Sequence, residues 1–276
     1  MEINLLVEIL VVLMPIMYLG LVALYAMAFF GGKPNAERQK TVFLIATIVI
    51  HLGYLIVRTI AFDHPPITTV FEIMTVLAAC IAVGYAYIEM RTKAKNTGLL
   101  ILSLAFVFQL VSSLYIKDLT VVSPVLRSRL LGFHVSTALL GYAAISLSAA
   151  YGFLYLMMYH EIKSSRFGLI YNRLPNLEML EKMSHKAEVF GFWMLSVAIL
   201  IGLVWLPRAF DDFSYWDPKL TGTLFIWSLY AIGLSAKRKF GWQGRRTMII
   251  AVLGFCFVVL SMTVINLYMS EFHSFH

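Results

Sequence analysis

The sequence predicts an all-α membrane protein, a bundle of about eight transmembrane helices. Hydrophobic residues make up 60% of the 276 residues and charged residues only 13%, whereas a soluble domain is about 45–50% apolar and about 25% charged. The apolar residues form runs of about 20, the length of a helix that crosses a bilayer. Basic residues gather in alternate connections between these runs, as they do in multi-pass membrane proteins.

The predicted spans cover most of the chain. The first has Glu2 and Glu8 near its start and no basic residue, so we expect a retained helix rather than a signal peptide, which needs a positive start. After the second, Pro65 and Pro66 prevent the helix from continuing. Runs this long exclude a transmembrane β-barrel. We predict spans near residues 5–30, 41–62, 70–90, 98–116, 130–158, 188–207, 221–236 and 247–270. We interpret residues 1–276 as a single domain.

The distribution of positive charge predicts the orientation. Most of the 22 Lys and Arg residues follow the first, third, fifth and seventh spans. Such connections face the cytoplasm, so we expect both termini outside a bacterial cytoplasmic (inner) membrane. Because the net charge of +7 is distributed in this way, it indicates membrane topology and argues against nucleic-acid binding.

The longest inner connection, residues 160–187, has apolar residues at helical spacing between charged ones. This pattern predicts an amphipathic helix in the membrane interface, and a docking helix for a cytosolic partner is the alternative. The two cysteines, Cys80 and Cys256, lie in apolar spans without a CxxC or CxxCH motif. We therefore expect small core residues rather than a disulfide, a thiol redox motif or a covalent haem attachment site.

The histidines suggest a ligand site at one membrane face. Four map to the predicted outer side: His64, His134, His273 and His276. They lie near a connection, residues 208–220, that is rich in aromatic and acidic residues. Two imidazoles and an aromatic surface suit haem, whose propionates need cations. The candidate cations are Arg58, Arg127, Arg129, Arg208 and Lys219.

Other interpretations of these residues stay open. Histidines and aromatic residues also gather at membrane interfaces without any ligand. His273 and His276 are three residues apart and could form a weak metal pair, although no zinc motif of the HExxH type occurs. His51 and Arg58 share one face of the second span, and ionisable groups there are functional candidates. Snorkelling is the alternative for Arg58, and Glu72 is its expected partner.

Four segments resemble a known family in order and spacing across nearly the whole chain. They are Tyr-Trp-Asp-Pro-Lys at 215–219, Phe-His-Val-Ser at 133–136, Phe-His-Ser-Phe at 272–275 and Pro-Ile-Thr-Thr-Val-Phe-Glu at 66–72. The first resembles the tryptophan-rich signature of the CcsA/CcmC/HemX family of haem-handling membrane proteins. The others are similar to that family's HVS, LHSYG and FPLSNLYES segments.

The resemblance implies a haem-handling protein of cytochrome c biogenesis type that presents haem at the outer face. Carried over, His134 and His273 would be the axial ligands of a non-covalent haem b. The expected platform and propionate contacts are Tyr215, Trp216, Asp217, Phe210, Arg58, Arg127 and Arg208. The resemblance also implies a ResB-type membrane subunit or apocytochrome c as partner. We assign no catalytic residue, and whether the protein is an enzyme stays open.

Departures from the family pattern favour its HemX-like branch. Phe210, Asp211 and Ser214 stand where the loop has Trp, Gly and Trp, and the family's later histidine has no match near Ser235. The alternative function is therefore a HemX-type regulator of glutamyl-tRNA reductase levels, which would contact a cytosolic haem-synthesis enzyme through its inner loops. A small-molecule transporter is disfavoured, because His51 and Gln109 offer little of a polar pathway.

Overall fold

The computed structural model describes residues 2–32, 34–92, 95–118, 128–165, 167–209, 214–216 and 218–261. Every regular element in these ranges is helical, so the all-α prediction is confirmed. The α-helices are α1 Glu2–Gly31, α2 Pro34–Phe62, α3 Val70–Thr92, α4 Gly98–Tyr115, α5 Arg129–Lys163, α6 Leu169–Arg173, α7 Leu177–Ala209, α8 Pro218–Phe240 and α9 Arg245–Leu260. A short 3₁₀ helix, η1 Lys95–Thr97, precedes α4.

Among the described residues, 6 helices are long and apolar enough to cross a membrane, namely α1 to α5 and α7. The protein is therefore a multi-pass membrane protein. The seventh and eighth predicted spans coincide with α8 and with the described part of α9.

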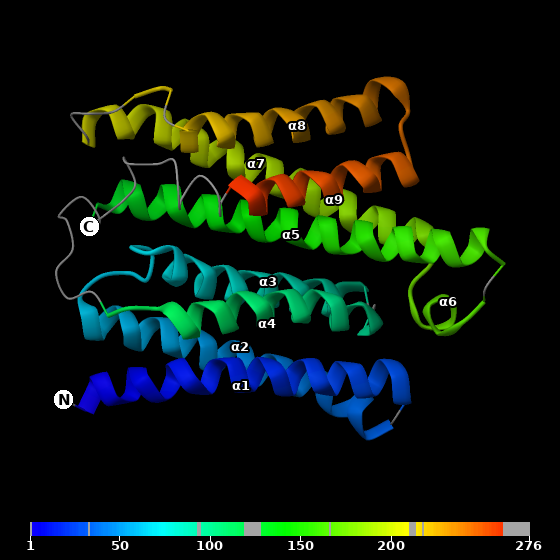
Figure 1. The fold of residues 1–276 in the computed structure, drawn as a ribbon, viewed down its shortest axis with the longest axis horizontal. Coiled ribbons are helices and arrows are strands. Elements are labelled where there is room, and N and C mark those ends of the chain that lie inside the picture. Colours follow the sequence, from blue (N-terminus) through cyan, green and yellow to red (C-terminus); the bar gives the residue numbers. More distant parts are fainter. Residues whose placement is uncertain are drawn as a thin grey trace. The chain divides into compact units, whose positions relative to one another are not determined.

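The chain divides into two compact units, and the prediction of a single domain stays a prediction. Unit 1 comprises Met1–Val122 and Phe167–Pro175, and unit 2 comprises Ser123–Arg166 and Asn176–His276. Figure 1 shows α1 beside α2 and α3 beside α4 in unit 1, and α5 beside α7 and α9 in unit 2.

Each of the four long helices of unit 1, α1 to α4, separates an exposed apolar side from a packed side. In α1, Met14, Tyr18 and Leu21 are fully buried, whereas Val12 and Ile16 are exposed. Exposed apolar side chains on a helix of this length are suited to contact with lipid. The packed side also contains polar residues, which α2, α3 and α4 supply.

The turn between α2 and α3 is closed by local contacts. Asp63 adopts a left-handed backbone with φ of 55° where α2 ends. At the start of α3, the Thr69 hydroxyl accepts a hydrogen bond from the Glu72 N–H at 3.1 Å. Thr and Glu three residues apart are the signature of a capped helix N-terminus. This cap fixes the position of Glu72 in the first turn of α3.

Unit 2 is built on close contact between α5 and α7. A Cβ on Gly191 would lie 3.1 Å from the Gly141 carbonyl oxygen, and one on Gly141 would lie 2.8 Å from Leu195. Further along, the Ser184 hydroxyl donates to the Ser148 carbonyl at 2.8 Å. Small residues let membrane helices approach closely enough to pack by van der Waals contact. These contacts also show that α5 and α7 are antiparallel.

The remaining helices of unit 2 pack on this pair. The Trp227 indole of α8 donates to the Ser196 hydroxyl of α7 at 2.8 Å and stacks on Phe192. Met248 of α9 places its carbonyl 3.2 Å from a Cβ built on Gly152 of α5. Val258, ten residues later in α9, belongs to a core cluster with Leu195.

Two expectations need correction. Residues 177–187 do not form a separate interfacial helix, because they are the first turns of α7, where Leu180 and Met183 are buried. The apolar spacing therefore marks the packed face of a longer helix. Cys80 is half-buried, whereas Cys256 is exposed on this chain and is not a core residue.

Candidate functional site

His134 lies near the beginning of α5, on the side that packs against α7. Its Nδ1 is 2.8 Å from the carbonyl oxygen of Ala198 in α7. Because a carbonyl can only accept a hydrogen bond, Nδ1 must carry the proton. In the neutral ring the lone pair is then on Nε2. A carbonyl that holds one ring nitrogen is the usual way in which a protein orients a histidine ligand for a metal.

Gly202 of α7 makes room for this ring. A Cβ at Gly202 would lie 3.0 Å from His134 Cε1 and 3.3 Å from Nδ1. The close packing of α5 against α7 through small residues therefore extends to His134. His134 was predicted from the sequence as a site residue, and Gly202 was not. A glycine within an apolar helix is the signal of close approach that could have indicated it.

The predicted aromatic connection belongs to the same end of unit 2. Since α5 and α7 are antiparallel, the start of α5 and the end of α7 are neighbours, and the connection to α8 follows there. Tyr215 is 60% exposed and Trp216 is 87% exposed. Arg208 is exposed in the last turn of α7. Large exposed aromatic groups mark surfaces that bind ligands or lipid.

Several predicted residues lie outside the described ranges: Phe210, Asp217, Arg127, His273 and His276. The proposed pairing of His134 with His273 therefore stays a prediction. The described part of α9 runs from the Gly152 end of α5 toward the core cluster that contains Leu195. The described part of α9 therefore runs toward the end of unit 2 that holds His134.

Arg58 of unit 1 is fully buried, and the expected partner is confirmed. Its Nε and Nη2 donate to Glu72 Oε1 at 3.1 and 3.0 Å. The other oxygen, Glu72 Oε2, accepts from the backbone N–H of Thr68 at 2.9 Å and from its hydroxyl. The guanidinium also lies over the Phe62 ring, 4.8 Å from the centroid. These contacts compensate for burying two charges.

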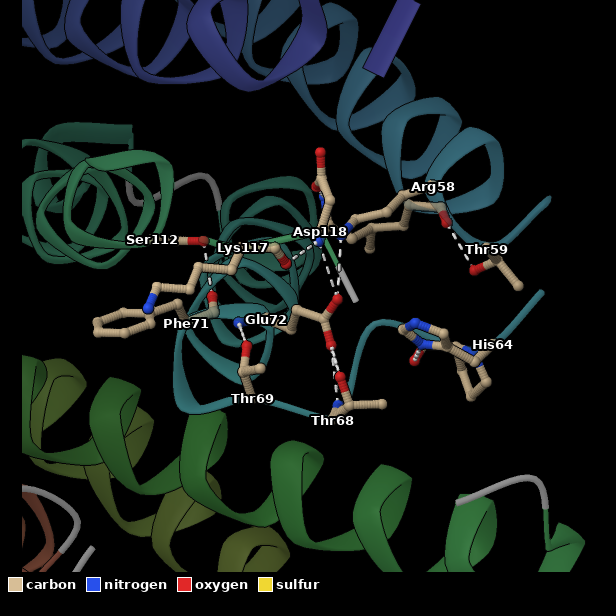
Figure 2. A network of polar contacts seen from close by, with 12 residues as sticks. Arg58, Thr59, His64, Thr68, Thr69, Phe71, Glu72, Ser112, Lys117 and Asp118 are labelled. Carbon is tan, nitrogen blue, oxygen red and sulfur yellow. Dashed lines mark hydrogen bonds and ion pairs between the residues drawn. The ribbon is translucent and has the colours of Figure 1, made fainter. Parts of the chain in front are cut away.

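Arg58 has a second carboxylate partner that sequence analysis missed. Its Nη1 donates to Asp118 Oδ1 at 3.0 Å, and its Nη2 donates to the Lys117 carbonyl at 2.9 Å. Figure 2 shows the Arg58 side chain reaching both Glu72 and Asp118. The arginine therefore joins the ends of α2, α3 and α4. Asp118 lies 60 residues after Arg58, so no local pattern could indicate the pair.

His64 lies in the turn beside this cluster, as Figure 2 shows. Its ring is buried, and its Nδ1 donates to the Pro65 carbonyl oxygen at 3.0 Å. Its ring centroid is 6.3 Å from that of Phe62. His64 belongs to unit 1 and His134 to unit 2.

His51 takes part in a chain of hydrogen bonds across four helices. Thr75 donates to Gln109 Oε1 at 2.7 Å, so its hydroxyl oxygen accepts from His51 Nε2 at 2.9 Å. His51 Nδ1 then accepts from the Tyr18 hydroxyl at 2.9 Å. The Gln109 amide donates onward to Ser113 at 3.1 Å. Both imidazole nitrogens are thus used within unit 1, and the chain holds α1 to α4 together.

The two remaining histidines are far from the His134 end of unit 2. His185 Nδ1 is 3.5 Å from Glu188 Oε2 on the same helix. A rise of 1.5 Å per residue places His185 about 25 Å from Gly202 along α7. His160 is exposed in the last turns of α5. Within the described ranges, no group of three or more His, Cys, Asp or Glu side chains is placed to hold a metal ion.

Comparison with known proteins adds the decisive observation. The sequence model of the family described as "Cytochrome C assembly protein" matches residues 9–273. The chain belongs to this family. Its relatives include proteins named "Cytochrome c biogenesis protein CcsA". One, from Prochlorococcus marinus (strain MIT 9215), is 28% identical over 95% of this chain and 94% of its own. Another, from Guillardia theta, is 27% identical over 86% of this chain and 84% of its own.

A third relative of that name, from Synechococcus sp. (strain RCC307), is 28% identical over 95% of each chain. The match to the cytochrome c assembly family supports the sequence-based resemblance at the level of the whole family. The CcsA name of these relatives does not support the HemX-like branch.

Proposed function

We propose that this cytochrome c assembly protein binds haem as its cargo at the outer face of a bacterial cytoplasmic membrane and presents it to apocytochrome c. The observation that carries the proposal is the state of His134. Its Nδ1–H is held by the Ala198 carbonyl, so that Nε2 is the atom suited to iron. The exposed Tyr215 and Trp216 belong to the same end of unit 2.

The proposed ligation is bis-histidine, with His273 as the second axial ligand of a non-covalently bound haem b. His273 is carried over from the family resemblance, and its position at the end of the chain follows α9. The absence of a CxxCH motif from the sequence favours non-covalent binding. Orienting His134 before haem arrives reduces the entropy lost on ligation.

The aromatic and cationic residues have separate proposed roles. Trp216 and Tyr215, with Phe210 and Asp217, form the surface on which the porphyrin packs. Arg208 and Arg127 are the proposed propionate partners, because guanidinium binds carboxylate with two parallel hydrogen bonds, and the role expected of Arg58 from the sequence stays a prediction. Arg208 is the exposed one among the described residues.

The chain's own residues bind and orient the cargo, and bound haem supplies the reactive vinyl groups and iron. An apocytochrome c that carries the thiols for attachment is the proposed downstream partner. A ResB-type membrane subunit is the proposed companion in the membrane. We propose no acid–base residue for this function.

The test is the absorption spectrum of the full chain purified in detergent, with and without added hemin. We expect a Soret band and split α and β bands after reduction, as bis-imidazole ligation gives. His134→Ala and His273→Ala should each lose this spectrum. His185→Ala is the matched control and should retain this spectrum, because His185 lies about 25 Å from Gly202 along α7. A wild-type protein that takes up no hemin contradicts the proposal.

The HemX-like branch stays a second proposal, supported by the tryptophan-poor connection with Phe210 and Ser214 in place of Trp. A protein of that branch would contact a cytosolic haem-synthesis enzyme. Gene neighbours separate the two: genes for a ResB-type protein and c-type cytochromes favour assembly, and genes for early haem synthesis favour regulation.

A further inference from the structure

The connection between α8 and α9, residues 237–246, contains basic residues and no acidic residue, and we call it the basic turn. Its cations are Lys237, Arg238, Lys239, Arg245 and Arg246. Lys237 donates to Glu181 Oε1 of α7 at 3.3 Å. The other four side chains are exposed, and none of them forms an ion pair with a described residue. Within the described part of the chain, four positive charges of the basic turn therefore have no counter-charge.

The basic turn is held in one conformation by contacts within unit 2. Gly241 and Gly244 both have φ of 63°, in the left-handed region that glycine adopts without strain. The Gly244 N–H donates to Glu181 Oε1 at 3.0 Å. The Arg245 guanidinium lies over the Tyr159 ring of α5, 5.7 Å from its centroid. Figure 1 shows the turn at the same end of unit 2 as the end of α5 and the start of α7. The cations are thus placed before any partner binds.

Membrane orientation and helix stability do not account for this arrangement. Positive residues orient a membrane protein by their charge, and this effect needs no ordered turn. The basic residues in the last turn of α8 complement the negative end of that helix dipole. Arg245 and Arg246, in contrast, stand at the positive end of α9, where no acidic residue accompanies them. A negatively charged partner would compensate for their unfavourable placement.

The aromatic residues of the basic turn indicate the kind of partner. Phe240 is 74% exposed between the two groups of cations, and Trp242 is half-buried. The cations begin directly after Ala236, where the predicted apolar span ends. Aromatic and basic residues at the end of a span lie at the level of the lipid headgroups. A soluble anion gives no reason for an exposed phenylalanine beside the charges, whereas a lipid has both a phosphate and acyl chains.

We propose that the basic turn binds the headgroup phosphate of an anionic phospholipid. The contacts are the four exposed cations Arg238, Lys239, Arg245 and Arg246, and Phe240 packs against the lipid chains. All these residues belong to unit 2, and the inference does not depend on haem. One cation near an anionic membrane surface changes a binding constant by about fivefold. We therefore expect a preference of at least about fivefold for phosphatidylglycerol over phosphatidylcholine.

Trp242 is a reporter inside the basic turn. The full chain is placed in phosphatidylcholine nanodiscs that contain the same fraction of one brominated lipid, either phosphatidylglycerol or phosphatidylcholine. Bromine quenches tryptophan on contact, and subtraction of the signal of Trp242→Phe isolates residue 242. Brominated phosphatidylglycerol should quench Trp242 as if enriched at least about fivefold, and high salt should reduce this preference by screening. Equal quenching by the two lipids in the wild-type protein overturns the proposal, and this comparison needs no charge variant.

Charge variants locate the preference, each measured with and without Trp242→Phe. Glutamine at the four exposed cations of the basic turn should abolish the preference, whereas Arg245→Lys/Arg246→Lys should keep it. The matched control replaces four other exposed cations with glutamine and should also keep it: Arg38, Lys163, Lys182 and Lys186. An equal loss in this control contradicts a local site. Inorganic phosphate at constant ionic strength should leave the quenching unchanged, and displacement of the lipid by phosphate overturns the assignment to a phospholipid.

Discussion

The two units hold their helices together in different ways. Unit 1 buries charged and hydroxyl groups between helices, including Arg58 with Glu72 and the chain from Tyr18 through His51 to Ser113. Unit 2 instead brings α5 and α7 together along glycines, alanines and serines. Both solutions suit a membrane, where lipid tails remove the hydrophobic driving force between helices. Unit 1 therefore depends on polar partners, and unit 2 depends on close fit.

This difference affects what each unit can do. The polar groups of unit 1 bond to one another, so that both ring nitrogens of His51 are already used within the unit. In unit 2 the close fit continues up to His134, where Ala198 and Gly202 hold the ring. We infer that unit 2 supplies an oriented imidazole.

The largest expected effect is that of Glu72→Ala in unit 1. It leaves the buried Arg58 without its buried partner, and breaking a buried pair in this way costs about 3–5 kcal/mol. The measurement is the free energy of unfolding in detergent. The double variant Arg58→Leu/Glu72→Leu removes both charges and should recover much of the loss. Equal stability of Glu72→Ala and wild type would show that unit 1 does not depend on this pair.

Gly191→Ala tests the close fit of unit 2. Its Cβ would lie 3.0 Å from Ile145 Cγ1 and 3.1 Å from the Gly141 carbonyl oxygen, so the backbones must separate. We expect a loss of about 1–3 kcal/mol in unfolding free energy. Gly132→Ala in α5 is the control, since a Cβ there meets no atom within 4 Å. Similar stability of the two variants would contradict the packing account.

Thr75→Val measures the hydroxyl chain of unit 1 without changing the shape of the side chain. His51 loses its acceptor and Gln109 loses its donor. Side-chain hydrogen bonds between membrane helices are worth about 0.6 kcal/mol each, so we expect a loss of about 1 kcal/mol in thermal or chemical unfolding. Thr75→Ser keeps the hydroxyl and should be less affected. The hemin spectrum should not change in either variant, because His51 is not the proposed ligand.

Gly202→Ala is expected to change stability least and hemin binding selectively. The new Cβ approaches His134 to 3.0 Å, so the ring must shift by a few tenths of an ångström. The unfolding free energy should fall by less than about 1 kcal/mol, as a surrounding side chain can move. Hemin affinity, measured by titration of the Soret band, should fall relative to Gly132→Ala. Unchanged affinity would mean that Gly202 does not position the histidine.

The helices, the Arg58–Glu72 pair and the choice of His134 as a site residue were predictable from the sequence. Apolar length predicted the spans, because the lipid core requires about 20 apolar residues per helix. The Arg58–Glu72 pair followed from two ionisable residues near one turn. Asp118 was not predictable, because its partner lies 60 residues earlier. The sixth span was predicted to start at residue 188, whereas α7 starts at Leu177. The charged residues between 178 and 186 interrupt the apolar run, although one face of this segment is buried within the unit.

The candidate site was predictable in its residue types and not in its geometry. His134 was identified from its place at a span end and from the family resemblance. Its bond to Ala198 could not be inferred, since a backbone carbonyl leaves no trace in side-chain patterns. The hydrogen bonds of His51 were likewise not predictable, because its partners Tyr18 and Thr75 come from two other helices.

The most direct measurement is chemical rescue of His134→Gly, which leaves an imidazole-sized space beside Gly202. Loaded with hemin, this variant should show the spectrum of iron that has lost one axial imidazole. Free imidazole should restore the bis-imidazole α and β bands, whereas His185→Gly should show wild-type bands throughout. Wild-type bands in His134→Gly before any imidazole is added would contradict the assignment of His134 as the haem ligand.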